Sequence, residues 1–109
     1  MKQLILARAY NKKGILVGQG TNSYLKTHPI QKYFANQVGE SHKEFLHAEI
    51  AAILKAGTKK IETLVIERYD KKDMPRLARP CPICMAAIKA NDIKYIRYTT
   101  NEGFTGEIL

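Results

Sequence analysis

The sequence predicts an α/β domain, a sandwich of three layers (α/β/α) built around one mixed β-sheet. Short apolar or β-branched runs, typical of strands, occur at the start of the chain and in its second half. Segments with helical spacing lie between them, and in the second half helices alternate with strands, as in α/β domains. The expected order is β-β-α-α-β-α-β. A length of 109 residues fits a single domain over residues 1–109.

The first elements are expected to be a β-hairpin and a helix. Two apolar runs, Gln3–Tyr10 and Ile15–Gln19, are separated by the turn sequence of residues 11–14. Pro29–Val38 is predicted to be a helix, because proline suits the first helical position and Gly39 can end the helix. Its apolar residues are expected to share one face: Ile30, Tyr33, Phe34 and Val38.

The strongest helix prediction covers Ser41–Ala56, and Gly57 is a natural stop. Ser41 and Glu44 have the spacing of a capping box, which would place the start of the helix at Ser41. A start nearer His47 is the alternative. The apolar positions of this helix are Phe45, Ile50, Ile53 and Leu54.

The remaining segments complete the expected order. Lys60–Arg68 is an apolar, β-branched run that predicts a strand, and Tyr69–Arg79 is a polar, basic loop. Cys84–Ala90 is expected to be a helix and Ile93–Thr99 a strand. The tail, Asn101–Leu109, contains two glycines and receives no assignment.

Charge and cysteine content narrow the classes of function. The chain has 18 Lys and Arg against 10 Asp and Glu, a net charge of +8 that attracts anions such as nucleotides or nucleic acid. The lysines are scattered, so a solvated surface is the alternative interpretation. Both cysteines lie in one C-x-x-C motif, which favours metal or redox chemistry over a structural disulfide. No apolar stretch suits a signal peptide or a membrane span, so we expect a cytoplasmic protein without a membrane partner.

Two motifs carry the functional prediction: residues 47–49 (His-Ala-Glu) and residues 80–84 (Pro-Cys-Pro-Ile-Cys). A catalytic zinc site usually has three protein ligands and one position for water, and His47, Cys81 and Cys84 can supply the three. Zinc lowers the pKa of its bound water toward about 7, and the hydroxide attacks a ring carbon that bears an amine. Glu49 would carry protons from the water to the ring nitrogen and then to the amine, which leaves as ammonia.

Three other interpretations compete with this one. A closed structural zinc site could add His42 to the two cysteines and His47, but it leaves Glu49 without a role. A redox C-x-x-C is the second, although the strand expected before such a motif is missing. The third is coincidence, which is disfavoured because both motifs open predicted helices.

These motifs resemble those of the cytidine deaminase-like superfamily, in particular its deoxycytidylate deaminase and tRNA adenosine or guanine deaminase branches. The matched segments are residues 47–53 and 80–88, and the order of elements extends the likeness to roughly residues 1–100. The resemblance implies that His47, Cys81 and Cys84 bind Zn²⁺ and that Glu49 moves protons.

Further expectations rest on the resemblance alone. The backbone of Ala48 would contact the base, Pro80 would shape the pocket, and Asn22 would bond the sugar or base. For Asn22, capping of a turn is the alternative. The helix that usually precedes the first strand is absent, and the helix at Pro29–Val38 lies instead between Asn22 and His47. Without the helix before the first strand, an apolar face of the sheet is left to be buried in another way, so we expect a homo-oligomer.

The expected substrate is a free cytosine nucleotide or nucleoside, such as deoxycytidylate, because the chain lacks the helical extensions that hold a nucleic-acid strand. Arg79 would contact phosphate, and Tyr98 lies where the family closes over the base. The alternatives are a deaminase of purines (guanine, adenine or tRNA adenosine) and a deaminase of cytosine in single-stranded nucleic acid. A zinc-stabilised module that binds nucleic acid is the non-enzymatic alternative.

Overall fold

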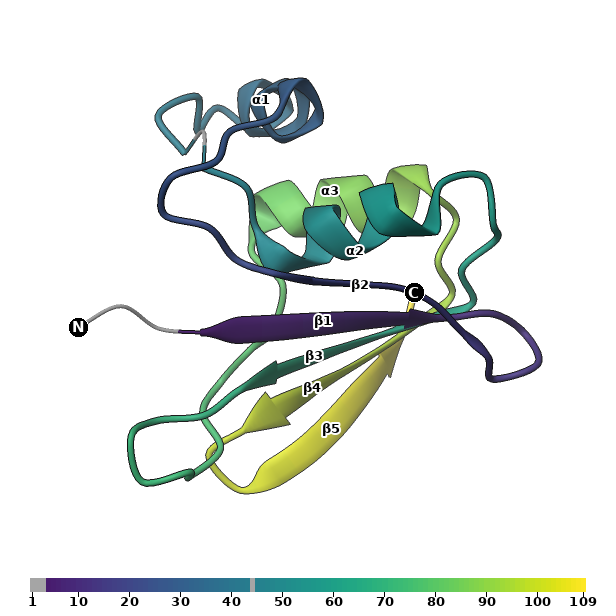
Figure 1. Cartoon of the computed structure of the whole chain (residues 1–109), viewed down its shortest axis with the longest axis vertical. Coiled ribbons are helices and arrows are strands. Elements are labelled where there is room, and N and C mark those ends of the chain that lie inside the picture. The colour runs from purple at the N-terminus through teal and green to yellow at the C-terminus, as the bar shows by residue number, and fades with distance from the viewer. Residues whose placement is uncertain (1–3, 44) are drawn as a thin grey trace.

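A computed structural model describes residues 4–43 and 45–109 of the chain. Five strands form one mixed sheet in the order β2-β1-β3-β4-β5, and three helices accompany it in these residues (Figure 1). The elements follow one another as β1 (Ile5–Tyr10), β2 (Leu16–Thr21), α1 (Pro29–Gln37), α2 (Ala48–Ala56), β3 (Thr63–Arg68), α3 (Pro82–Ala90), β4 (Tyr95–Thr100) and β5 (Gly103–Ile108). The predicted α/β class and mixed sheet are confirmed.

The pairing of the strands fixes where the helices lie. β1 is antiparallel to both of its neighbours, β2 and β3, and β4 is antiparallel to β5. β3 and β4 form the parallel pair of this sheet, and α3 is the crossover between them. The chain passes from β2 to β3 through α1 and α2. These two connections are long enough to hold helices, whereas β1–β2 and β4–β5 are hairpins.

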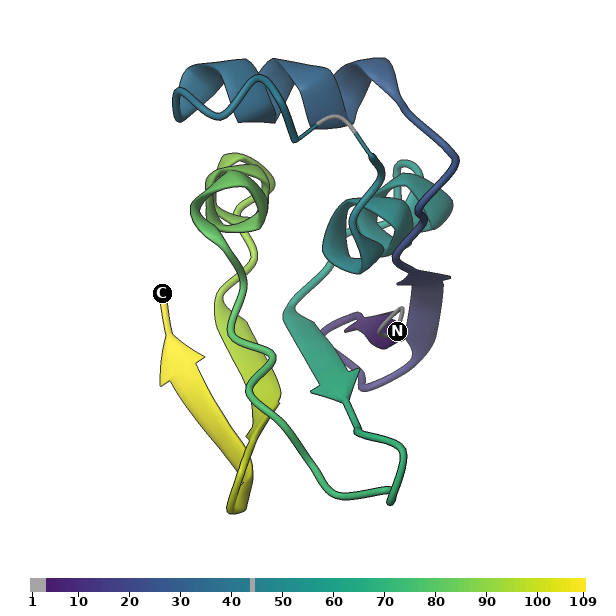
Figure 2. The same cartoon turned by 90° about the vertical axis from the view of Figure 1, so that its left-hand side faces the viewer.

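All three helices lie on one side of the sheet, which corrects the expected α/β/α order of layers. Figure 2 shows α2 and α3 side by side against the sheet, with α1 lying across them as a third layer. No helix of the described residues covers the opposite face. The physical reason is topological, because β4 continues directly into the β5 hairpin and leaves no crossover to carry a helix to that face.

Two buried clusters hold these layers together. One fills the space between the sheet and the helices, and its strand residues alternate along β1, β3 and β4: Ala7, Ala9, Leu64, Ile66, Ile96 and Tyr98. The other lies among the helices, where Ala35 of α1 packs with Ile50 of α2 and with Ile83, Cys84 and Ala87 of α3. The second cluster therefore includes one of the two cysteines of the functional motif.

Two glycines of β2 bring α2 unusually close to the sheet. A Cβ atom at Gly18 would lie 2.5 Å from the carbonyl oxygen of Ala52, and one at Gly20 would lie 2.5 Å from the Cβ of Ala51. Side chains at these positions would collide with the helix, so glycine sets the spacing between β2 and α2.

Several predicted boundaries differ from the structure. α2 begins at Ala48, as the alternative start near His47 anticipated, and Ser41 lies in a turn before it. Glu44, the second member of the expected capping box, lies outside the described residues. α3 begins at Pro82, because proline suits the first helical position. The unassigned tail forms β5, which continues the sheet as an edge strand.

The buried face of α1 also differs from the prediction. Gln31 and Ala35 are fully buried, whereas Tyr33 is 56% exposed and Ile30 is 39% exposed.

In the described part of the chain, no helix combines the length and the apolar character that crossing a bilayer requires.

Candidate metal centre and active site

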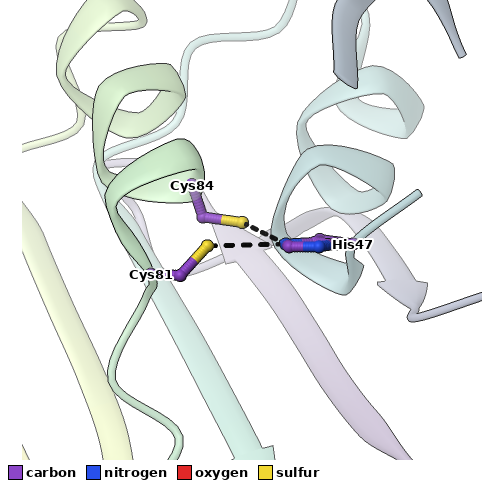
Figure 3. A group of neighbouring side chains, drawn as sticks. All are labelled: His47, Cys81 and Cys84. Atoms are coloured by element: carbon purple, nitrogen blue, oxygen red, sulfur yellow. Dashed lines mark hydrogen bonds between the residues drawn. The ribbon is translucent and has the colours of Figure 1, made fainter. Parts of the chain in front are cut away.

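The N-termini of α2 and α3 meet at the carboxyl end of β3, and each begins at a predicted metal ligand. His47 is the N-cap of α2 and Cys81 is the N-cap of α3, both in extended backbone conformation. Neither side chain caps its own helix, which leaves the imidazole and the thiol able to face one another. Cys84 follows one helical turn after Cys81 and points to the same place (Figure 3).

The three side chains form a compact donor set. Nδ1 of His47 lies 3.3 Å from Sγ of Cys84 and 3.5 Å from Sγ of Cys81 (Figure 3). One donor atom from each residue lies within 4.8 Å of the others. One nitrogen and two sulfur atoms from partly or fully buried residues are a set that zinc prefers, so the chemistry of the donors fits Zn²⁺.

The electrostatics of the cysteines also fit a cation. The pKa of Cys81 is lowered to about 4, chiefly by a hydrogen bond from the thiol of Cys84 and further by His47. The pKa of Cys84 is raised, because it donates that bond and is buried. The pKa of His47 is raised, mainly by its hydrogen bond with Cys81. One sulfur is therefore held as a thiolate, the form that binds metal.

The closed structural zinc site, with His42 as a fourth ligand, finds no support in the geometry of the described residues. His42 lines the neighbouring cavity, but among the described residues the group of potential ligands consists of His47, Cys81 and Cys84. Both cysteines are free thiols. A three-ligand set leaves a coordination position open, which is the arrangement of catalytic zinc.

Glu49 lies beside this set in the first turn of α2. Its side chain is 6% exposed and contributes to the wall of the same cavity as His47 and Cys81. Burial raises the pKa of Glu49, and the nearby thiolate of Cys81 adds to the shift. A carboxyl group whose pKa is raised accepts a proton more readily than an exposed one, which suits a general base that later returns the proton.

The cavity at the metal ligands has a volume of about 480 Å³. This lies within the range of roughly 300–1,000 Å³ that is usual for small-molecule sites. Three of the expected substrate residues, Asn22, Ala48 and Arg79, line it, whereas Pro80 and Tyr98 are not among its lining residues. Pro80 is buried behind the start of α3.

The polar atoms of the expected substrate residues are engaged within the protein. The side-chain oxygen of Asn22 accepts a hydrogen bond from the backbone N–H of Ile5 at 2.8 Å, which ties the loop after β2 to β1. The guanidinium of Arg79 donates two hydrogen bonds to the carboxylate of Glu107, at 2.7 and 3.0 Å. The hydroxyl of Tyr98 donates to the same carboxylate at 2.6 Å. Arg79 and Tyr98 thus meet through a residue of β5.

Several residues of the site were missed by the sequence interpretation. Glu107 lies in the tail that received no assignment, so nothing placed it beside Arg79. Gln31 of α1 contacts the backbone of His47 and was assigned to no face of its helix. Further residues of the cavity wall that sequence reasoning did not select come from loops: Ser23, Lys43, Phe45 and Leu77. For Gln31 a signal existed, because residues 31, 34, 35 and 38 follow the spacing of one helical face.

The fold and the site together define a zinc-binding α/β domain whose metal ligands share a cavity with a buried carboxyl group. The family model of the cytidine and deoxycytidylate deaminase zinc-binding region matches residues 3–100. The chain belongs to this family, and it is a zinc-dependent deaminase. No curated protein matches the chain.

Proposed function

We propose that the protein is a hydrolytic deaminase of a cytosine nucleotide or nucleoside, and that Glu49 is its proton carrier. The observation that carries the proposal is the position of Glu49, a buried carboxyl group in one cavity with the metal ligands His47 and Cys81. The family match to cytidine and deoxycytidylate deaminases supports cytosine as the base. The proposal places the enzyme in nucleotide metabolism in the cytoplasm.

The residues divide the chemistry among them. Bound by His47, Cys81 and Cys84, zinc supplies the acidity that makes the attacking water reactive near neutral pH. Glu49 accepts a proton from that water and delivers it to the ring nitrogen beside the attacked carbon. Once the oxygen has added to the ring carbon, Glu49 takes the remaining proton of that oxygen and delivers it to the exocyclic amine. The carbonyl then forms as the C–N bond breaks, and ammonia leaves. The raised pKa of Glu49 supports the first step, because it makes the carboxylate a stronger proton acceptor.

Binding of the substrate would use the walls of the cavity. Ala48 presents the first turn of α2 to the base, and Asn22 lies on the side of the loop after β2. Arg79 and Lys43 line the cavity, where each is paired with a carboxylate, Glu107 and Glu40. A phosphate on the substrate would therefore contact Arg79 by exchanging with Glu107. Pro80 supports the start of α3, and Tyr98 acts through Glu107 rather than by direct contact.

The test is ammonia release from a panel of substrates: deoxycytidylate, deoxycytidine, cytosine, guanine, adenosine and single-stranded DNA containing cytosine. We expect conversion of the cytosine nucleotide or nucleoside. Conversion of a purine alone would contradict the proposal that the base is cytosine. Conversion of the DNA alone would favour a nucleic-acid deaminase. Binding of DNA without conversion of any substrate would favour the non-enzymatic module. Elemental analysis is the first measurement, with about one zinc per chain expected for a catalytic site.

Self-association is a further part of the proposal. The sheet face that carries no helix among the described residues exposes large apolar side chains: Tyr95, Phe104 and Ile108. Burial of this face in a homo-oligomer would remove apolar surface from water. Light scattering coupled to size-exclusion chromatography measures the mass of the protein directly. A monomer at micromolar concentration would refute self-association.

A further inference from the structure

The helix α1 carries one polar side chain that is fully buried, Gln31. Its carbonyl oxygen accepts a hydrogen bond from the backbone N–H of His47 at 3.1 Å, and its amide nitrogen donates to the carbonyl oxygen of Lys43 at 3.3 Å. Because a backbone N–H only donates and a carbonyl only accepts, these two partners fix the orientation of the amide. One side chain thus joins both ends of the segment that leads into α2.

The backbone of His47 depends on such contacts because its side chain is committed elsewhere. As the N-cap of α2, His47 makes no side-chain capping bond, and its imidazole faces Cys81 and Cys84 (Figure 3). The residue before it is held by the loop after β2. Leu46 donates to the carbonyl of Lys26 at 2.9 Å and accepts from the N–H of Ser23 at 2.8 Å. Gln31 adds the contact at His47 itself.

The same helix also packs against the cysteine side of the metal centre. Ala35, one turn after Gln31, lies in the buried cluster that contains Cys84 and Ala87 of α3. Figure 2 shows α1 lying across both α2 and α3. The helix therefore contacts the two elements that carry the ligands, by hydrogen bonds to the segment before α2 and by apolar packing on α3.

We propose that Gln31 is a positioning residue of the metal centre, which aims the imidazole of His47 at the two cysteine sulfurs. This inference rests on the proposed function in that the three ligands hold zinc. Loss of the contact lets the N–H of His47 move away from α1, and the imidazole turns out of line with Cys81 and Cys84. The N–H of His47 and the carbonyl of Lys43, both of which bond to the fully buried side chain of Gln31, would also lose these partners, which costs free energy.

The test compares Gln31→Met with Gln37→Met, a matched substitution in the same helix at an exposed position. Methionine has a similar length but forms neither hydrogen bond. We expect Gln31→Met to bind zinc about tenfold more weakly in competition with a chromophoric chelator, the lower end of the effect seen for residues that orient ligands. The absorption bands of the cobalt-substituted protein should also shift, because they report the geometry of one nitrogen and two sulfur ligands. Gln37→Met should leave both measurements unchanged.

A second variant keeps the inference testable where Gln31→Met does not fold. In Gln31→Glu, whether the carboxyl group is ionised or protonated, an oxygen can still accept from the N–H of His47. We expect its cobalt spectrum to stay close to that of wild type, with Gln37→Glu as the control. Wild-type affinity and spectrum in Gln31→Met would overturn the inference, as would a displaced cobalt spectrum in Gln31→Glu. If the wild-type chain itself binds no zinc, the proposed function fails first, so the two failures are distinct.

Discussion

A single methyl group added at Gly18 tests how closely α2 is held against the sheet. The new Cβ would lie 2.5 Å from the carbonyl oxygen of Ala52 and 2.7 Å from the backbone nitrogen of Ala56, and both atoms belong to the helix. The shorter distance is about 0.9 Å below the 3.4 Å at which ordinary contact begins. Backbone cannot rotate away as a side chain can, so the whole helix must move. Overpacking of this kind costs about 1–3 kcal/mol.

Thermal unfolding followed by circular dichroism measures this cost in Gly18→Ala. At about 4 °C for each kcal/mol in a domain of this size, the midpoint should fall by roughly 4–12 °C. Gly106→Ala is the control, because it also lies in a strand but its Cβ would come no closer than 3.1 Å to Ile96. A midpoint of Gly18→Ala equal to or above that of Gly106→Ala would refute the reasoning that glycine sets the spacing of α2.

Three further outcomes are expected. Glu49→Gln should keep its zinc and its fold but lose roughly 10²–10⁴-fold in ammonia release, the usual contribution of a general acid–base group, and undiminished turnover would exclude the proton-carrier role. Zinc binding at pH 7 should release at least one proton, because Cys84, whose pKa is raised, must ionise, while Cys81, with a pKa of about 4, is already a thiolate. Calorimetry in buffers of different ionisation enthalpy counts these protons, and a count of zero contradicts the assignment. Arg79, followed by the Tyr98 hydroxyl, lowers the pKa of Glu107 to about 2, so this carboxylate stabilises the fold above its ordinary pKa of 4.5. The free energy of unfolding, measured with chelator throughout, should therefore be higher for wild type than for Glu107→Gln above pH 5. This difference should disappear as the pH falls from about 4.5 toward 2, and a difference that grows on acidification would contradict the prediction.

The metal centre could be predicted because its residues are both specific in type and close in sequence. His47 and Glu49 are two residues apart, and Cys81 and Cys84 lie one helical turn apart, so the local geometry of two helix starts determines most of the site. The residue classes add to this, since an imidazole and two thiols favour zinc over other cations.

The parts that escaped prediction depend on contacts between segments far apart in the chain. Glu107 meets Arg79 across 28 residues, and only the pairing of β5 with β4 brings it there. The tail lacked the apolar alternation that identifies a strand, because an exposed edge strand has little to bury. Gln31 was overlooked for the opposite reason, as a polar residue on the buried face of α1 that is satisfied by hydrogen bonds rather than by apolar packing.

The position of the ligands at the starts of two separate helices has a consequence for the lifetime of the folded protein. His47 and Cys81 are 34 residues apart, so a metal that joins them acts as a removable cross-link across the chain. By analogy with a disulfide, closing such a loop is worth up to about 4 kcal/mol in reduced freedom of the unfolded chain. The supply of zinc would then regulate how long the folded protein survives, independently of how fast it turns over its substrate.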